Sequence, residues 1–201
     1  DRDTVKYFKD KKTFFLTPLG VGSHLKGWGI NPDKITELDW WGSVKKGGIN
    51  FTATPAQHFS GRGLFKRNKT LWAGWVIEKG TQKVFFSGDT GYDTHFKDIG
   101  EKLGPFDLAF LDSGQYNVLW KEVHLLPKEV PLAFFDLKAR HLIPIHWGMF
   151  EISMHPWYEP AQKLKENALK KGIKLLTPKI GQIIELGKNQ ETSSWWESLI
   201  P

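Results

Sequence analysis

Short apolar runs rich in β-branched and aromatic residues alternate with longer amphipathic stretches along this chain, and this alternation limits its fold more than any other feature. The clearest case is a run over residues 72–78, a turn at Lys79-Gly80-Thr81, and a second run over residues 83–87, which is typical of a β-hairpin. Because strands interleaved with helices pack as layers, the sequence predicts a layered α/β or α+β domain.

The other expected elements are read from the same patterns. We expect further strands over residues 13–16, 35–41, 49–54, 107–111, 141–145, 174–176 and 182–186, and helices over residues 21–30, 94–103, 127–138 and 159–171. Gly172 is expected to cap the last of these helices. The chain then becomes polar from Lys188 until Trp195-Trp196, which we expect to dock on the domain or on a neighbouring chain.

Composition narrows the functional classes. The chain has 201 residues, 40% of them hydrophobic, which suffices for one globular domain or for part of a larger one. Its apolar runs are much shorter than the roughly 20 residues that cross a bilayer, so no transmembrane segment is expected. The net charge of +6 favours anionic substrates. Because the basic residues are scattered rather than clustered, no nucleic-acid partner is expected.

The absence of cysteine leaves histidine and carboxylate side chains as the candidate metal ligands. Three such side chains each follow an expected strand, with a glycine or another small residue nearby: His58, Asp89 and His146. Together they predict a metal site, because loops at strand ends are where a rigid scaffold presents functional groups. The alternative for each alone is structural: a half-buried histidine, or an aspartate that bonds its own turn.

A fourth histidine, His124, precedes the expected helix at residues 127–138. It is either an acid–base group or donor to a substrate oxyanion, or else an ordinary surface histidine, and its spacing favours neither. Asp112 follows a strand at the same sheet edge and is a weaker candidate. His24, His95 and His155 have no comparable setting and are assigned structural roles.

Five segments in order carry a resemblance to a known family: Thr54-Pro55-Ala56-Gln57-His58, Phe86-Ser87-Gly88-Asp89-Thr90-Gly91-Tyr92, Gly104-Pro105-Phe106-Asp107-Leu108-Ala109, His124 with Pro127 and Glu129, and Ile145-His146-Trp147-Gly148. Over residues 1 to about 186 the chain resembles the metallo-β-lactamase fold superfamily. Within it, the chain is most similar to the branch that includes N-acyl phosphatidylethanolamine phospholipase D and its bacterial relatives. The resemblance implies an α+β fold, an αββα sandwich.

The resemblance also implies roles for the candidate residues. His58 would bind a first metal, His146 a second, and Asp89 both, while His124 would lie near the substrate phosphate. The implied cofactor is two zinc ions, with iron or manganese as alternatives. The implied reaction is hydrolysis by a metal-bridging hydroxide, as a phosphodiesterase acting on a phospholipid-like or other anionic substrate.

One family feature is missing, because the chain contains no His-x-His. In relatives the motif His-x-His-x-Asp-His lies just before a segment like Asp1-Arg2-Asp3. We therefore expect residues 1–187 to be the C-terminal portion of such a domain, incomplete at the N-terminus, and residues 188–201 to be a tail. Such a portion would be inactive alone.

An incomplete sandwich would also expose an apolar sheet face. We expect it to form a homo-oligomer or to associate with the missing N-terminal portion, through Trp40-Trp41 or Trp195-Trp196. The alternative function is a non-catalytic binding or structural relative that has lost its metal centre. A nuclease of the same superfamily would need a basic groove.

Overall fold

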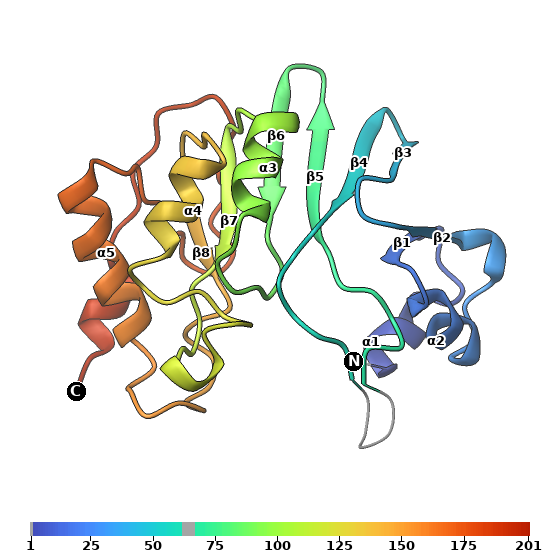
Figure 1. Ribbon diagram of the computed structural model, residues 1–201, viewed down its shortest axis with the longest axis horizontal. Coiled ribbons are helices and arrows are strands. Elements are labelled where there is room, and N and C mark those ends of the chain that lie inside the picture. The colour runs from blue at the N-terminus through green and yellow to red at the C-terminus, as the bar shows by residue number, and fades with distance from the viewer. Residues whose placement is uncertain (1, 62–66) are drawn as a thin grey trace.

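The computed structural model describes residues 2–61 and 67–201, and its main feature is a mixed sheet of six strands in the order β3-β4-β5-β6-β7-β8 (Figure 1). The strands β3 to β6 are antiparallel, whereas β6, β7 and β8 run parallel. Their bounds are β3 Ser43–Lys46, β4 Ile49–Thr54, β5 Gly74–Lys79, β6 Gln82–Phe86, β7 Leu108–Asp112 and β8 Leu142–Ile145. A separate parallel pair joins β1 (Phe15–Pro18) to β2 (Ile35–Leu38).

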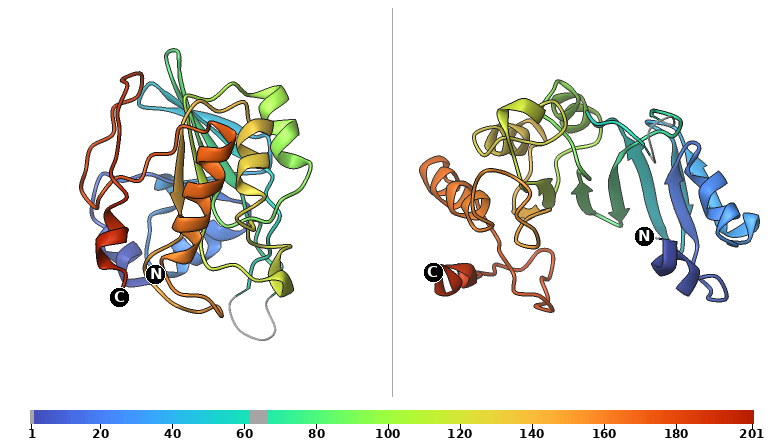
Figure 2. Two further views of the ribbon diagram at one scale, coloured as in Figure 1. Left: turned by 90° about the vertical axis from the view of Figure 1, so that its left-hand side faces the viewer. Right: turned by 90° about the horizontal axis from the view of Figure 1, so that it is seen from below.

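Helices cover one face of the large sheet (Figure 2). These are α3 (His95–Lys102), α4 (Val130–Asp136) and α5 (Glu159–Lys171), while α1 (Arg2–Tyr7) and α2 (Val21–Gly27) lie beside β1 and β2. The core forms between helices and sheet, where alternate residues of β5, β6 and β7 such as Val76, Phe85 and Leu111 are buried against Phe96 of α3 and Leu164 of α5. The period of two along each strand decides which side chains enter this core.

The segment after α5 crosses to the other face of the sheet, as Figure 2 shows. There Leu176, Ile184 and Leu186 pack on Leu108 and Ile143. Phe86 on β6, whose side chain points the same way as that of Leu108, keeps 39% of its surface exposed. Among the described residues, the segment after α5 therefore covers only part of this second face of the sheet.

The predicted hairpin is confirmed as β5–β6, and the helix at residues 159–171 is confirmed with Gly172 as its left-handed cap. Two predicted strands are wrong. In the segment 174–176, Leu175 forms a single bridge to Leu142, and the segment 182–186 forms no strand because its apolar side chains lie flat on the sheet face. Three further predictions are too long, since the helix at 21–30 ends at Gly27, the strand at 35–41 ends at Leu38, and the helix at 127–138 covers only residues 130–136. The strand predicted at 13–16 lies at 15–18.

The C-terminal tail docks on the domain. Trp196, in the short 3-10 helix η3 (Trp195–Leu199), is fully buried, and its ring lies 5.3 Å from that of Trp147, just after β8. The ring of Trp195 stacks on Trp147 at 5.5 Å. Among the described residues, no helix is long and apolar enough to cross a membrane.

Candidate metal centre

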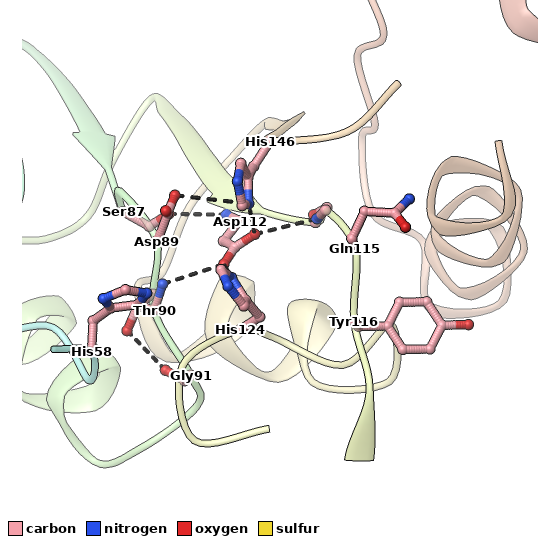
Figure 3. A network of polar contacts seen from close by, with 12 residues as sticks. His58, Ser87, Asp89, Thr90, Gly91, Asp112, Gln115, Tyr116, His124 and His146 are labelled. Atoms are coloured by element: carbon pink, nitrogen blue, oxygen red, sulfur yellow. Dashed lines mark hydrogen bonds and ion pairs between the residues drawn. The ribbon is translucent and has the colours of Figure 1, made fainter. Parts of the chain in front are cut away.

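The centre of the site is Asp112, the last residue of β7, whose side chain is entirely inaccessible to solvent. Its Oδ2 lies 2.8 Å from Nδ1 of His124, and its Oδ1 lies 3.2 Å from Nδ1 of His146 (Figure 3). The backbone N–H groups of Thr90 and Gly114 also donate to this carboxylate, at 3.3 and 3.2 Å. Each carboxylate oxygen thus accepts two hydrogen bonds, which offsets the cost of burying the charge.

These contacts shift the pKa values of the pair in opposite directions. Burial alone would raise the pKa of Asp112, but the hydrogen bonds and charges of His124 and His146 outweigh it and leave that pKa below its usual value. The hydrogen bond to Asp112 raises the pKa of His146 against the effect of burial, and the Asp89 charge adds to the rise. Because both histidines direct Nδ1–H toward the carboxylate, each keeps Nε2 free for another partner.

The backbone places His146 in an uncommon conformation directly after β8. Its φ of 67° lies in the left-handed region, which costs a residue with a Cβ energy unless its surroundings enforce it. Gly114 makes room for it, because a Cβ at position 114 would lie 2.2 Å from the His146 carbonyl oxygen and 2.7 Å from its Nδ1. A glycine at position 114 is therefore a condition for the observed position of the imidazole.

Asp89 and His58 complete the cluster from two other strand ends. Asp89 follows β6, and its Oδ1 lies 3.8 Å from Nδ1 of His146. His58 follows β4; its Nδ1 lies 2.7 Å from the carbonyl oxygen of Phe59. The ring of His58 lies 5.6 Å from that of His124, whose ring lies 5.2 Å from that of His146. The structure thus brings all four predicted site residues together, as Figure 3 shows.

Among the described residues, one group of side chains has potential ligand atoms close enough together to hold a divalent metal. The potential ligand atoms of Asp112, His124 and His146 lie within 4.8 Å of one another. However, the oxygens of Asp112 are already engaged by four donors, so a metal there would displace the hydrogen bonds that orient both histidines. His58, Asp89 and His146 offer imidazole and carboxylate groups with free atoms, the donor chemistry that zinc, iron or manganese requires. Asp112 contacts His146 directly through its Oδ1.

Asp112, the weaker candidate from the sequence, is the residue that contacts both His124 and His146. The sequence feature that points to Asp112 is its position after an expected strand, at the same sheet edge as Asp89. The contact of Asp112 with His146 is not local, because 34 positions separate the two residues. The other four histidines have different neighbours. His24 stacks on Trp28, His155 stacks on Tyr116, and Nδ1 of His141 lies 3.1 Å from the carbonyl oxygen of Asp107. His95 is buried beside Thr90, where burial lowers its pKa to about 4.

A cavity lies outside this cluster, and none of the four predicted site residues lines it. It has a volume of about 680 Å³ and is lined by Tyr116, Leu126, Met154 and Glu159, among others. The side chain of Tyr116 points away from the histidines (Figure 3). The groups that could hold a metal ion converge at the histidine cluster instead.

Comparison with known proteins gives the family. A model of the beta-lactamase superfamily domain matches residues 1–147. The chain belongs to this superfamily. The match spans well over half of the chain and includes His58, Asp89, Asp112, His124 and His146.

Two relatives show how far the similarity extends. An uncharacterized protein of Mycobacterium tuberculosis is 40% identical over 185 residues, which cover 90% of this chain and 50% of that protein. The N-acyl-phosphatidylethanolamine-hydrolyzing phospholipase D 1 of Caenorhabditis elegans is 40% identical over 179 residues, which cover 83% of this chain and 50% of that protein. The chain therefore spans about half the length of these curated relatives.

Solved structures confirm the fold. Igni18, a metallo hydrolase of the archaeon Ignicoccus hospitalis, superposes with a TM-score of 0.65 at 23% identity, covering 88% of this chain and 70% of that one. The predicted α+β class and metallo-β-lactamase fold are therefore confirmed. In this chain the fold consists of the six-stranded sheet with its layer of helices and the separate β1–β2 pair.

Proposed function

We propose that this chain carries part of the active site of a metal-dependent phosphodiesterase that acts on a phospholipid-like substrate. The observation that supports this most is the convergence of His58, Asp89 and His146, from three separate strand ends, around His124 and the buried Asp112. The similarity to a phospholipase D over most of the chain supports the choice of a phosphodiester as the bond that is hydrolysed.

The proposed metal ligands are His58, Asp89 and His146, and the proposed metal is zinc, with two ions in the complete site. Bound there, the metal ions would supply an activated water and neutralise charge on a phosphate oxygen. The residues of this chain hold their own groups ready for that chemistry: the Phe59 carbonyl oxygen fixes Nδ1 of His58, and Asp112 fixes Nδ1 of His146. Such partners orient a ligating imidazole and raise its basicity.

His124 is the proposed catalytic residue beside the metals. Asp112 holds its Nδ1, so Nε2 faces the space shared with His58 and His146. From there it would donate a hydrogen bond to a phosphate oxygen or deliver a proton to the departing oxygen. The net charge of +6 assists the approach of an anionic substrate. In this proposal residues 1–187 form the C-terminal portion of the metallo-β-lactamase-like domain, and residues 188–201 form a tail that packs on Trp147, next to His146.

The first experiment measures metal content per chain by elemental mass spectrometry, on this chain and on a form extended at its N-terminus. We expect zinc in the extended form, and less zinc after His58→Ala, Asp89→Ala or His146→Ala. His24→Ala is the matched control, because His24 lies on α2 beside Trp28. Absence of metal from both forms would refute the proposal and favour a non-catalytic relative.

The second experiment tests the reaction. The metal-loaded extended form should hydrolyse an N-acylated phosphatidylethanolamine and a simple aryl phosphodiester. His124→Ala should lower the turnover number by about 10²- to 10⁴-fold, the usual contribution of an acid–base group, without lowering the zinc content. Loss of zinc together with activity in this variant would instead make His124 a ligand.

A further inference from the structure

Thr90, next to Asp89, connects two of the strand ends that form the site. It is 1% exposed. Its Oγ1 accepts a hydrogen bond from the backbone N–H of Gln57 at 2.8 Å, and the same hydroxyl donates to the carbonyl oxygen of Gly91 at 2.9 Å. The Thr90 side chain therefore joins the backbone beside His58 to the backbone beside Asp89.

The backbone of Thr90 makes the second connection. Its N–H donates to Oδ2 of Asp112, the oxygen that also accepts from His124. Thr90 thus contacts the segment after β4 through its hydroxyl, and it contacts the carboxylate at the end of β7 through its backbone N–H. Because Asp112 also contacts His146, a shift of Thr90 would reach all the candidate ligands.

Contacts of Gln57 and Gly91 with Glu122 hold the same loops together. Gln57 pairs with Gly91 through a bridge, and its side-chain Nε2 donates to Oε2 of Glu122 at 2.8 Å. Gly91 in turn lies so close to Glu122 that a Cβ at position 91 would be 2.6 Å from the Glu122 carbonyl oxygen. Glu122 precedes His124 by two residues. The loops that carry His58, Asp89 and His124 are therefore packed together around Thr90.

We propose that Thr90 is a positioning residue: its hydroxyl fixes the spacing between His58 and Asp89, while its amide fixes Asp112. The metal consequence rests on the proposed function, because it takes His58, Asp89 and His146 as ligands. The positioning itself concerns only contacts within this chain. Valine has nearly the shape of threonine but neither accepts nor donates through its side chain, and serine keeps the hydroxyl.

The first test compares zinc affinity by calorimetric titration in the extended form of the protein. Thr90→Val should bind zinc about 10- to 100-fold more weakly, the usual effect of losing a partner outside the ligand shell, and Thr90→Ser should regain most of the affinity. The matched control is Thr177→Val. Thr177 is 5% exposed, and its hydroxyl bonds to the C-terminal segment at the Ser193 carbonyl oxygen, away from these ligands.

The second test needs no metal. Amide hydrogen exchange in the metal-free chain should be faster at Gln57 in Thr90→Val than in the unsubstituted chain, because that amide loses its acceptor. It should be unchanged at Gln57 in Thr177→Val. Thermal unfolding of each variant separates this local effect from a general loss of stability.

The two tests separate failure of this proposal from failure of the proposed function. If zinc binds and Thr90→Val binds it as tightly as the unsubstituted protein does, or if Thr90→Ser does not restore affinity, the positioning role is overturned. If no form binds zinc, the proposed function fails, and the exchange rate at Gln57 alone decides whether Thr90 positions the loop. An unchanged rate there would overturn the proposal.

Discussion

Nδ1 of His124 lies 2.8 Å from Oδ2 of Asp112, a carboxylate with no surface exposed to solvent. The same carboxylate contacts His146 through its other oxygen. Asp112 therefore holds Nδ1 of two imidazoles whose rings stack 5.2 Å apart. Burying a carboxylate is costly, and removing one partner of a buried pair leaves the other charge uncompensated.

Asp112→Asn tests this relationship. The amide has almost the same shape but carries no charge, and its nitrogen cannot accept from a histidine N–H. We expect about 10- to 100-fold weaker zinc binding, measured by calorimetric titration. We also expect a loss of about 1–3 kcal/mol in the free energy of unfolding, measured with urea, because a buried polar group loses its partner.

Asp107→Asn is the control for that change. Its carboxylate accepts the Lys83 backbone N–H at 2.9 Å and pairs with Arg140, so this variant also loses a charged hydrogen-bond acceptor. It should lose stability but keep its zinc affinity. Equal zinc affinity in Asp112→Asn and Asp107→Asn would show that Asp112 does not orient the ligands.

Gly114→Ala should displace His146. The added Cβ would meet the His146 carbonyl oxygen at 2.2 Å and its Nδ1 at 2.7 Å, which forces the backbone to move. We expect a loss of about 1–3 kcal/mol in unfolding free energy, as for other overpacked sites, and zinc binding at least about 10-fold weaker. Gly27→Ala on α2 is the control, because nothing lies within 4 Å of its Cβ. If Gly114→Ala binds zinc like Gly27→Ala, the close packing at His146 is not required.

The sequence predicts correctly those helices and strands that are determined by residues close together in the chain. The hairpin β5–β6 needs only two apolar runs and a turn glycine, and α5 needs only its amphipathic period and Gly172. The segment 182–186 shows the limit of this reasoning. Its alternation suits a strand, yet Ile184 and Leu186 pack over the sheet rather than pair beside it, and the sequence period is the same in both cases.

The site likewise has features that the sequence predicts and features that depend on contacts between distant residues. That His58, Asp89 and His146 follow strands could be read from the chain. These strands are β4, β6 and β8, which all point the same way, because β4 and β6 are each antiparallel to β5 and β6, β7 and β8 are parallel, so their ends lie at one edge. The tautomers and ring orientations could not be read, because they depend on Asp112 and Gly114, both more than 30 positions from His146. The φ of His146 likewise follows from this packing rather than from its own residue type.

Trp196→Ala tests whether the tail stabilises the domain. Trp196 is fully buried against Trp147, one residue after His146. Removing its ring should cost about 3–5 kcal/mol in unfolding free energy by urea titration, as for other buried tryptophans. Leu199→Ala in the same short helix, where the side chain is 60% exposed, should change it by less than about 0.5 kcal/mol. A change in Trp196→Ala as small as the one expected for Leu199→Ala would mean that the burial of Trp196 contributes no packing energy.

The last prediction concerns pH. Burial lowers the pKa of His95 to about 4, whereas the unfolded chain protonates this histidine near its ordinary value of 6.5. Between these two values the unfolded state binds a proton that the folded state does not, so stability must fall as the pH falls. This residue alone should remove about 2 kcal/mol between pH 7.5 and pH 5.

His146 acts in the opposite direction, because its pKa is raised in the fold and protonation therefore stabilises it at low pH. The contribution of His95 is consequently measured as a difference between variants, by urea unfolding at both pH values. His95→Phe keeps a ring beside Phe96 and removes the titration, so its stability should fall about 2 kcal/mol less than that of the unsubstituted chain. His24→Gln retains His95 and should keep the full decrease. Equal decreases in His95→Phe and His24→Gln would show that His95 is not held neutral by burial.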